Sequence, residues 1–113
     1  MKDISGKLEY KGTEYKVVFN LNVIEKIQEE YGSIEKWGEV TSSGEGNAKA
    51  IKFGFWAMIN EGIEITNEDT GENVKPLTLS QVGRILTDIG LENATELLHK
   101  TVVDSTKSEE KNA

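Results

Sequence analysis

The sequence predicts an α+β fold, in which an N-terminal β-hairpin precedes a mainly helical domain that carries a second small hairpin. Two observations predict it: apolar residues alternate with polar ones near the N-terminus, and further along they recur every three or four positions. Turn-forming residues separate these segments. The 113 residues suit one globular domain over 1–104, followed by a polar and disordered tail over 105–113.

The first hairpin is predicted from two alternating segments around a polar turn. Apolar and polar side chains alternate in Lys7–Tyr10 and again in Tyr15–Phe19. The residues between them include Gly12, which suits a tight turn. This pattern is typical of two antiparallel strands that bury one face.

Two helices are expected next. Asn22 and Glu25 fit the N-cap and third position of a first helix. Gly32 suits the left-handed conformation that ends such a helix. Ser33 can cap a short second helix whose apolar face includes Trp37.

The most apolar segment of the chain, Ala48–Glu61, is predicted to be a helix. It follows the polar loop Thr41–Asn47, which contains two glycines. Its main apolar stripe consists of Ile51, Phe55, Met58 and Ile59.

A second apolar surface of this helix is the candidate partner-binding site. Phe53 and Trp56 fall opposite the main stripe, near Lys49 and Asn60. A helix that is apolar on both faces is either buried centrally or presents one face to a partner. Aromatic residues are also frequent at the energetic centres of interfaces. The sequence leaves two alternatives open: the aromatics cover the hairpin or the last helices, or they bind a partner protein.

The second hairpin is expected after this helix. Ile63 and Ile65 alternate with polar residues, and the polar run Asn67–Asn73 is followed by Val74. The turn is expected near Gly71, and the proline two residues after Val74 restricts the second strand to an edge position.

Two amphipathic helices complete the predicted domain. Thr78 and Gln81 form a capping-box pattern at the start of the first, and Gly90 ends it. Gly83 inside this helix costs about 1 kcal/mol relative to Ala. The apolar stripes are Leu79, Val82, Ile85, Leu86 and Ile89 in the first helix, and Leu91, Ala94, Leu97, Leu98 and Val102 in the second.

Composition argues against several classes of function. The chain has no Cys, one His and a formal charge of −7. Disulfide scaffolds, thiolate metal sites and multi-His zinc sites are therefore excluded, and the acidic balance argues against nucleic-acid binding. No segment approaches the roughly 20 apolar residues that span a bilayer, and Met1–Asp3 leads into no apolar signal-peptide core. We therefore expect a cytoplasmic protein that binds neither nucleic acid nor membrane.

No constellation of catalytic residues emerges from the sequence. His99 is the only imidazole, and the serines lack the glycines of a nucleophile elbow. The acidic segment Asn67–Asn73 lacks the spacing of a calcium loop, and Gly44–Gly46 lacks the residues of a phosphate-binding loop. We therefore expect a non-enzymatic protein with no metal ion and no cofactor.

The order of segments resembles a known family. Lys7–Phe19 runs directly into the helix Asn22–Gly32, and the helical segments Phe53–Gly62 and Leu77–Leu86 follow. Over Ile4–Val103, this order resembles the tail assembly chaperones of long-tailed bacteriophages, including their prophage and gene-transfer-agent relatives.

The resemblance implies a small, acidic, non-enzymatic protein that acts in the cytoplasm of a bacterial host. It implies binding to the long, helical tape measure protein, which the chaperone keeps soluble and delivers for polymerisation of the tail tube. The tail tube protein is a second candidate partner. The alternative function is a structural tail or connector subunit of a phage or prophage particle. The oligomeric state is left open.

Overall fold

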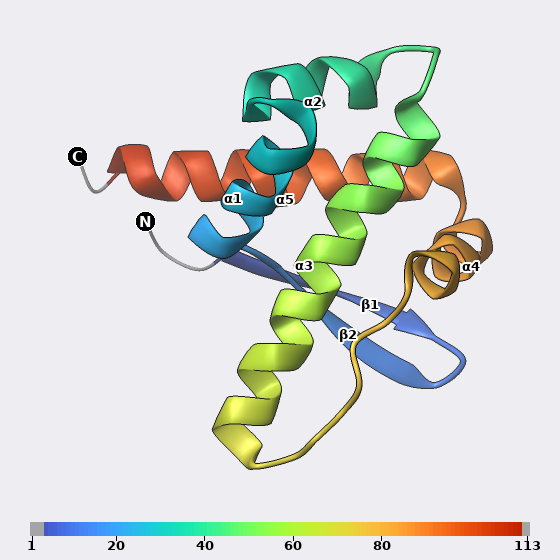
Figure 1. The fold of residues 1–113 in the computed structure, drawn as a ribbon, viewed down its shortest axis with the longest axis vertical. Coiled ribbons are helices and arrows are strands. Elements are labelled where there is room, and N and C mark those ends of the chain that lie inside the picture. Colours follow the sequence, from blue (N-terminus) through green and yellow to red (C-terminus); the bar gives the residue numbers. More distant parts are fainter. Residues whose placement is uncertain (1–3, 112–113) are drawn as a thin grey trace.

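The predicted α+β fold is confirmed, with one antiparallel hairpin and five helices among residues 4–111 (Figure 1). The computed structural model describes these residues, and the surroundings of side chains from Gly6 to Val103. In chain order the elements are β1 (Ile4–Tyr10), β2 (Thr13–Phe19), α1 (Leu21–Tyr31), α2 (Ile34–Ser42), α3 (Asn47–Thr70), α4 (Leu79–Ile89) and α5 (Leu91–Lys111).

The first hairpin forms as predicted. β1 and β2 pair in antiparallel register, from Ile4 opposite Phe19 to Tyr10 opposite Thr13. The two residues between the strands, Lys11 and Gly12, have φ values of 50° and 79°. Positive φ at both central positions is what a type I′ turn requires, and its twist matches that of the flanking strands.

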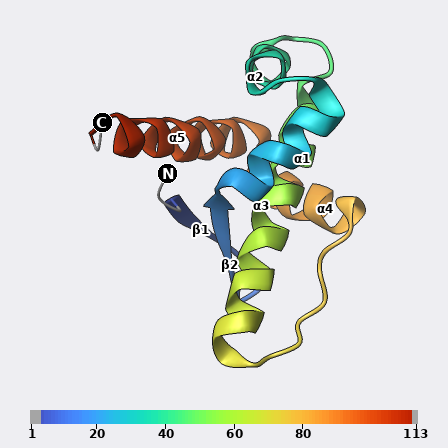
Figure 2. The ribbon, with the colours of Figure 1, turned by 60° about the vertical axis from the view of Figure 1, so that its left-hand side comes forward.

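Helix α3 is the central element of the fold. It packs against β2 and against all four other helices, while α5 also covers β1. It is long enough to run from the region beside α2 to the opposite end of the molecule, as the view in Figure 2 shows. The predicted main stripe is completely buried, and it consists of Ile51, Phe55, Met58 and Ile59.

Two glycines allow close packing around α3. A Cβ atom on Gly54 would lie 2.5 Å from Cζ2 of Trp37, and one on Gly62 would lie 2.5 Å from the carbonyl oxygen of Lys16. Real Cβ atoms do not approach other atoms this closely. The absence of a side chain at Gly62 therefore lets α3 lie directly on the backbone of β2.

The predicted start of α1 is wrong by two residues. The N-cap is Asn20, whose Oδ1 accepts a hydrogen bond from the amide of Val23 at 3.3 Å. Asn22, which was expected at the cap with Glu25 three positions later, lies inside the helix. The strand ends at Phe19, and Asn20 keeps an extended backbone, with φ of −142° and ψ of −173°, as is usual for an N-cap residue. Both asparagine side chains donate hydrogen bonds to Oε2 of Glu61, at 2.7 Å and 3.0 Å.

The predicted N-caps of α2 and α4 and the predicted ends of α1 and α4 agree with the structure. Ser33 caps α2 by accepting a hydrogen bond from the amide of Lys36 at 3.0 Å. Thr78 and Gln81 form both bonds of a capping box at the start of α4. Gly32 and Gly90 end α1 and α4 with φ values of 92°, which a residue with a side chain rarely adopts.

The second hairpin is not formed, and the only sheet among residues 4–111 is the pair β1 and β2. Helix α3 instead continues to Thr70, and Gly71 ends it in the left-handed conformation. Ile63 lies one helical turn after the buried Ile59, so the helical period continues through the segment that was expected to alternate. Residues 71–78, which we name the strap, leave Gly71 and return along α3 to α4 (Figure 2).

Helix α5 continues beyond residue 104, where the globular domain was predicted to end. It extends to Lys111, so the segment expected to be a disordered tail, 105–113, is helical as far as that residue. Residues 104–111 contain no Gly or Pro to interrupt a helix. Met1–Asp3 and positions 112–113 lie outside the described residues.

Candidate partner-binding surface

The predicted aromatic pair lies between α3 and α1. Phe53 and Trp56 are both half-buried, with ring centroids 5.5 Å apart. The ring centroids of Phe53 and Tyr31 are 5.8 Å apart in an edge-to-face arrangement, and the ammonium group of Lys26 lies 5.1 Å from the centroid of a Trp56 ring. The latter distance is within the range of cation–π attraction. The pair therefore packs on α1, a neighbour that neither of our sequence-based alternatives named.

Asn60 and Trp56 together hold the end of the strap. The side-chain amide of Asn60 accepts a hydrogen bond from the Leu77 amide at 2.8 Å and donates one to the Leu77 carbonyl at 3.0 Å. The indole N–H of Trp56 donates to the same carbonyl at 3.1 Å. One side-chain amide thus satisfies both backbone groups of Leu77, as a neighbouring strand would.

Asn67 repeats this arrangement further along α3. Its Nδ2 donates to the Val74 carbonyl and its Oδ1 accepts from the Val74 amide, both at 3.0 Å. Asn60 and Asn67 are seven residues apart, so they share a helix face and are separated by about 10.5 Å. Val74 and Leu77 are three residues apart in an extended strap, which spans about 10 Å. The helical and extended spacings therefore match, and we name Asn60 and Asn67 the asparagine clamps.

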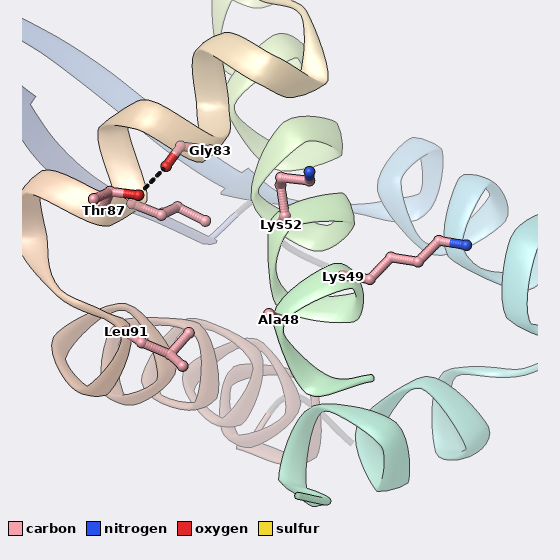
Figure 3. Close-up of a pocket in the computed structure, with 7 residues that line it drawn as sticks. Ala48, Lys49, Lys52, Gly83, Thr87 and Leu91 are labelled. Carbon is pink, nitrogen blue, oxygen red and sulfur yellow. Dashed lines mark hydrogen bonds between the residues drawn. The ribbon is translucent and has the colours of Figure 1, made fainter. Parts of the chain in front are cut away.

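Lys49 lies on a different surface from the other three predicted site residues. It is exposed and lines a hollow of about 560 Å³ between α3, α4 and the start of α5 (Figure 3). The hydroxyl of Thr87 in this hollow is already bonded to the Gly83 carbonyl at 2.8 Å, as Figure 3 shows. The lining is mainly apolar, and it consists of Ala48, Lys49, Lys52, Gly83, Leu86, Thr87 and Leu91.

A second hollow adjoins the first. It has a volume of about 490 Å³ and shares Leu91, whose side chain is 47% exposed. We name the two hollows together the helical groove. The remaining lining residues of the second hollow are Asn47, Glu92, Thr95, Glu96 and His99.

Charged residues line both hollows of the helical groove. Lys49 and Lys52 line the first hollow, although the Lys49 side chain extends away from Thr87 and Leu91 (Figure 3), and Glu92 and Glu96 line the second. Among the side chains that the structure describes, the ion pair is Lys7–Glu14 in the hairpin, at 3.6 Å. None of these four side chains therefore forms an ion pair with another described side chain.

Sequence reasoning placed three of its four site residues together and missed the groove. Phe53, Trp56 and Asn60 lie side by side on α3, whereas Lys49 belongs to the groove. Whether these four residues bind a partner stays a prediction. The groove is built from three helices, and its one signal in the sequence is Gly83, because a glycine inside a helix often marks a close approach or a functional need.

Within the described part of the chain, no group of three or more His, Asp or Glu side chains could hold a metal ion. No described helix combines the length and apolar character needed to cross a bilayer. Comparisons of the chain with protein-family models, with curated proteins and with solved structures find no match.

Proposed function

We propose that this protein is a phage tail assembly chaperone, which binds the tape measure protein and keeps it soluble during tail assembly. The observation that supports the proposal is the helical groove, with Leu86 in its wall and the exposed Leu91 at its centre. Grooves of this kind receive the apolar face of an amphipathic helix. The identity of the partner, the tape measure protein, comes from the order of segments, which resembles that of the tail assembly chaperones.

The proposed activity is non-enzymatic and requires a complex that can dissociate. Burial of Leu91 and of two facing apolar side chains would contribute about 1.5–3 kcal/mol each. Association costs an estimated 4–15 kcal/mol in lost freedom of motion. One groove therefore binds one helix weakly, and a long helical partner would be covered by many copies that are released as the tail tube forms. The net charge of −7 would keep such a covered partner from aggregating.

Co-expression tests the proposal. The tape measure protein encoded in the same phage or prophage region should become more soluble when this chain is present, and the two should co-purify. Leu91→Glu should abolish both effects, because it places a charge at the centre of the groove. Leu21→Glu is the matched control, since Leu21 is 68% exposed on α1 and should tolerate the charge.

Two outcomes would contradict the proposal. The first is an unchanged soluble fraction with no co-purification. The second is recovery of the protein in purified particles by mass spectrometry, together with assembly of the isolated chain into rings. That second outcome would favour the structural tail or connector subunit.

A further inference from the structure

We propose that the outer edge of β1 pairs with β1 of a second copy of this chain, in antiparallel orientation, so that the two hairpins form one continuous sheet. In this pairing Lys7 lies opposite Glu9 of the second copy, and Glu9 lies opposite Lys7 of the second copy. The inference concerns the association of the chain with itself, so it goes beyond the proposed function and does not depend on it.

The outer edge of β1 carries backbone groups that are available for a further strand. Opposite residues of an antiparallel pair alternate between bonded and non-bonded pairs. The two-residue turn makes the residues that flank it a bonded pair, and two positions earlier the register makes Leu8 bond to Tyr15. Lys7 and Glu9 therefore direct their N–H and C=O groups away from β2. Among the described residues, none forms a hydrogen bond to these outward groups.

The other edge of the hairpin is already covered. The same alternation directs the backbone of Lys16 outward from β2, and a Cβ atom on Gly62 of α3 would lie 2.5 Å from its carbonyl oxygen. Figure 2 shows β2 between β1 and α3. An uncovered edge strand is a template for pairing with another chain, and β1 contains neither a Pro nor a bulge that would oppose this.

The charges on the hairpin favour a second copy as the occupant. Lys7 lies opposite Lys16, and Glu9 lies opposite Glu14, so like charges face one another across the two strands. Such pairs are destabilising. Lys7 compensates through a diagonal ion pair with Glu14 at 3.6 Å, whereas Glu9 forms no ion pair with a described side chain. A second β1 strand brings a lysine to Glu9 and a glutamate to Lys7.

Symmetry and charge together select one register. Outward-directed residues must oppose one another, so the possible registers differ by steps of two residues. Registers that place Lys7 opposite Lys7, or Glu9 opposite Glu9, bring like charges together. The intermediate register, which is centred on Leu8, places Lys7 opposite Glu9 twice, because a two-fold axis repeats each contact.

The selected register also matches side chains on the face of the sheet that packs on α5. Gly6 would lie opposite Tyr10 of the second copy, and an aromatic ring beside a strand glycine compensates for its missing side chain. A Cβ atom on Gly6 would lie 3.6 Å from Cδ1 of the half-buried Leu97, so the same ring would adjoin that leucine. Pairing along one short edge buries a small area, so the dimer should dissociate on dilution.

Sedimentation velocity and amide hydrogen exchange test the pairing in the wild-type protein. The average mass should rise from that of a monomer toward that of a dimer as the protein concentration is raised. Over the same range, exchange of the Lys7 and Glu9 amides should slow, because these amides become bonded only in the dimer. The Leu8 amide is the internal control, since it is already bonded within the hairpin and should change little.

Charge variants test the register. Lys7→Glu alone, and Glu9→Lys alone, should each weaken self-association about tenfold, because each creates two like-charged pairs in the dimer. When the two variants are mixed, both pairs again join Glu to Lys, so a dimer of one variant with the other should form preferentially. Lys36→Glu and Glu39→Lys are the matched controls, since both residues are exposed on α2 and the changes alter the net charge equally.

A proline variant tests the use of the backbone. Glu9→Pro removes an outward N–H without removing a bond of the hairpin, so thermal unfolding should show a folded protein while self-association is lost. A protein that stays monomeric at all concentrations, exchange at Lys7 and Glu9 that does not vary with concentration, or the absence of a mixed dimer would overturn the inference. If a designed extended peptide with alternating Lys and Glu shifts the signals of Lys7 and Glu9 while the chain stays monomeric, the edge receives a foreign strand, and pairing of two copies is refuted.

Discussion

Replacement of Asn60 by Asp would convert one donor of the strap's attachment into an acceptor while leaving the size of the side chain almost unchanged. The amide of Asn60 donates to the Leu77 carbonyl at 3.0 Å and accepts from the Leu77 amide at 2.8 Å. In the variant Asn60→Asp, the second bond persists. The first is replaced by a carboxylate oxygen that faces a carbonyl oxygen.

The magnitude follows from the contacts at Leu77. The lost bond contributes about 1 kcal/mol, and a partly buried carboxylate oxygen without a donor costs about 1–3 kcal/mol. The Leu77 carbonyl keeps the Trp56 indole as a donor at 3.1 Å, so no further cost arises there. The free energy of unfolding should therefore fall by about 2–4 kcal/mol at neutral pH.

The pH dependence of this loss has a definite sign. Because only the ionised carboxyl is disfavoured next to the Leu77 carbonyl, the pKa of the new carboxyl is raised in the folded state. The destabilisation is complete above that raised pKa and declines as the pH falls toward the unfolded value of about 3.9. The protonated carboxyl can then donate to the Leu77 carbonyl and restore the lost bond.

Urea unfolding followed by tryptophan fluorescence measures both effects. The wild type and Asn60→Asp are compared at about pH 7 and pH 4, and the difference between the two proteins is taken at each pH. Asn67→Asp is the matched control, because it makes the same two bonds to Val74 in a more exposed place and should cost about 1 kcal/mol. A loss below about 0.5 kcal/mol for Asn60→Asp, or an equal loss at both pH values, would refute the reasoning.

Two further predictions concern close packing and a buried hydroxyl. Gly62→Ala would place a methyl group 2.5 Å from the Lys16 carbonyl oxygen and should destabilise the protein by about 1–3 kcal/mol, whereas Gly38→Ala, which meets open space on α2, should stabilise it by about 1 kcal/mol. Thermal unfolding compares the two, and equal effects would show that α3 does not lie directly on β2. Burial, with a smaller contribution from Glu30, raises the pKa of Tyr31, whose hydroxyl has no hydrogen-bond partner among the described residues. Tyr31→Phe should change the free energy of unfolding by less than about 1 kcal/mol at neutral pH. Above about pH 10 the variant should lose less stability than the wild type, because it has no phenol whose ionisation the folded state opposes. Urea unfolding at both pH values measures this, and an equal loss of stability in the two proteins at high pH would contradict it.

The hairpin and the helix order were predictable because each depends on local patterns. Val17 and Phe19 share the buried side of an alternating strand, and Gly32 and Gly90 mark helix ends that only glycine adopts easily. The second hairpin was wrong because Ile63 and Ile65 fit alternation over too short a window. The longer helical period, which links Ile63 to Ile59, decides the conformation.

The candidate site was less predictable because its residues meet only after packing. Nothing near Trp56 in the sequence indicates that its indole bonds the carbonyl of Leu77, which lies 21 residues away. The groove likewise requires α3, α4 and α5 to converge, and Leu91 is exposed although it belongs to a predicted core stripe. Only Gly83 indicated the groove in the sequence, because a glycine inside a helix lowers its stability and nothing in the neighbouring sequence explains its presence.

The asparagine clamps also determine which parts of the strap are free to vary. They bind the backbone of Val74 and Leu77 and make no use of either side chain. Pro76, which has no N–H to donate, lies between the two clamped positions, where no donor is required. Between its two ends the strap therefore needs a peptide chain of the right length with an N–H at two positions, so substitutions at Glu72, Asn73 and Lys75, which are exposed, would alter the surface of the protein without detaching α4 from α3.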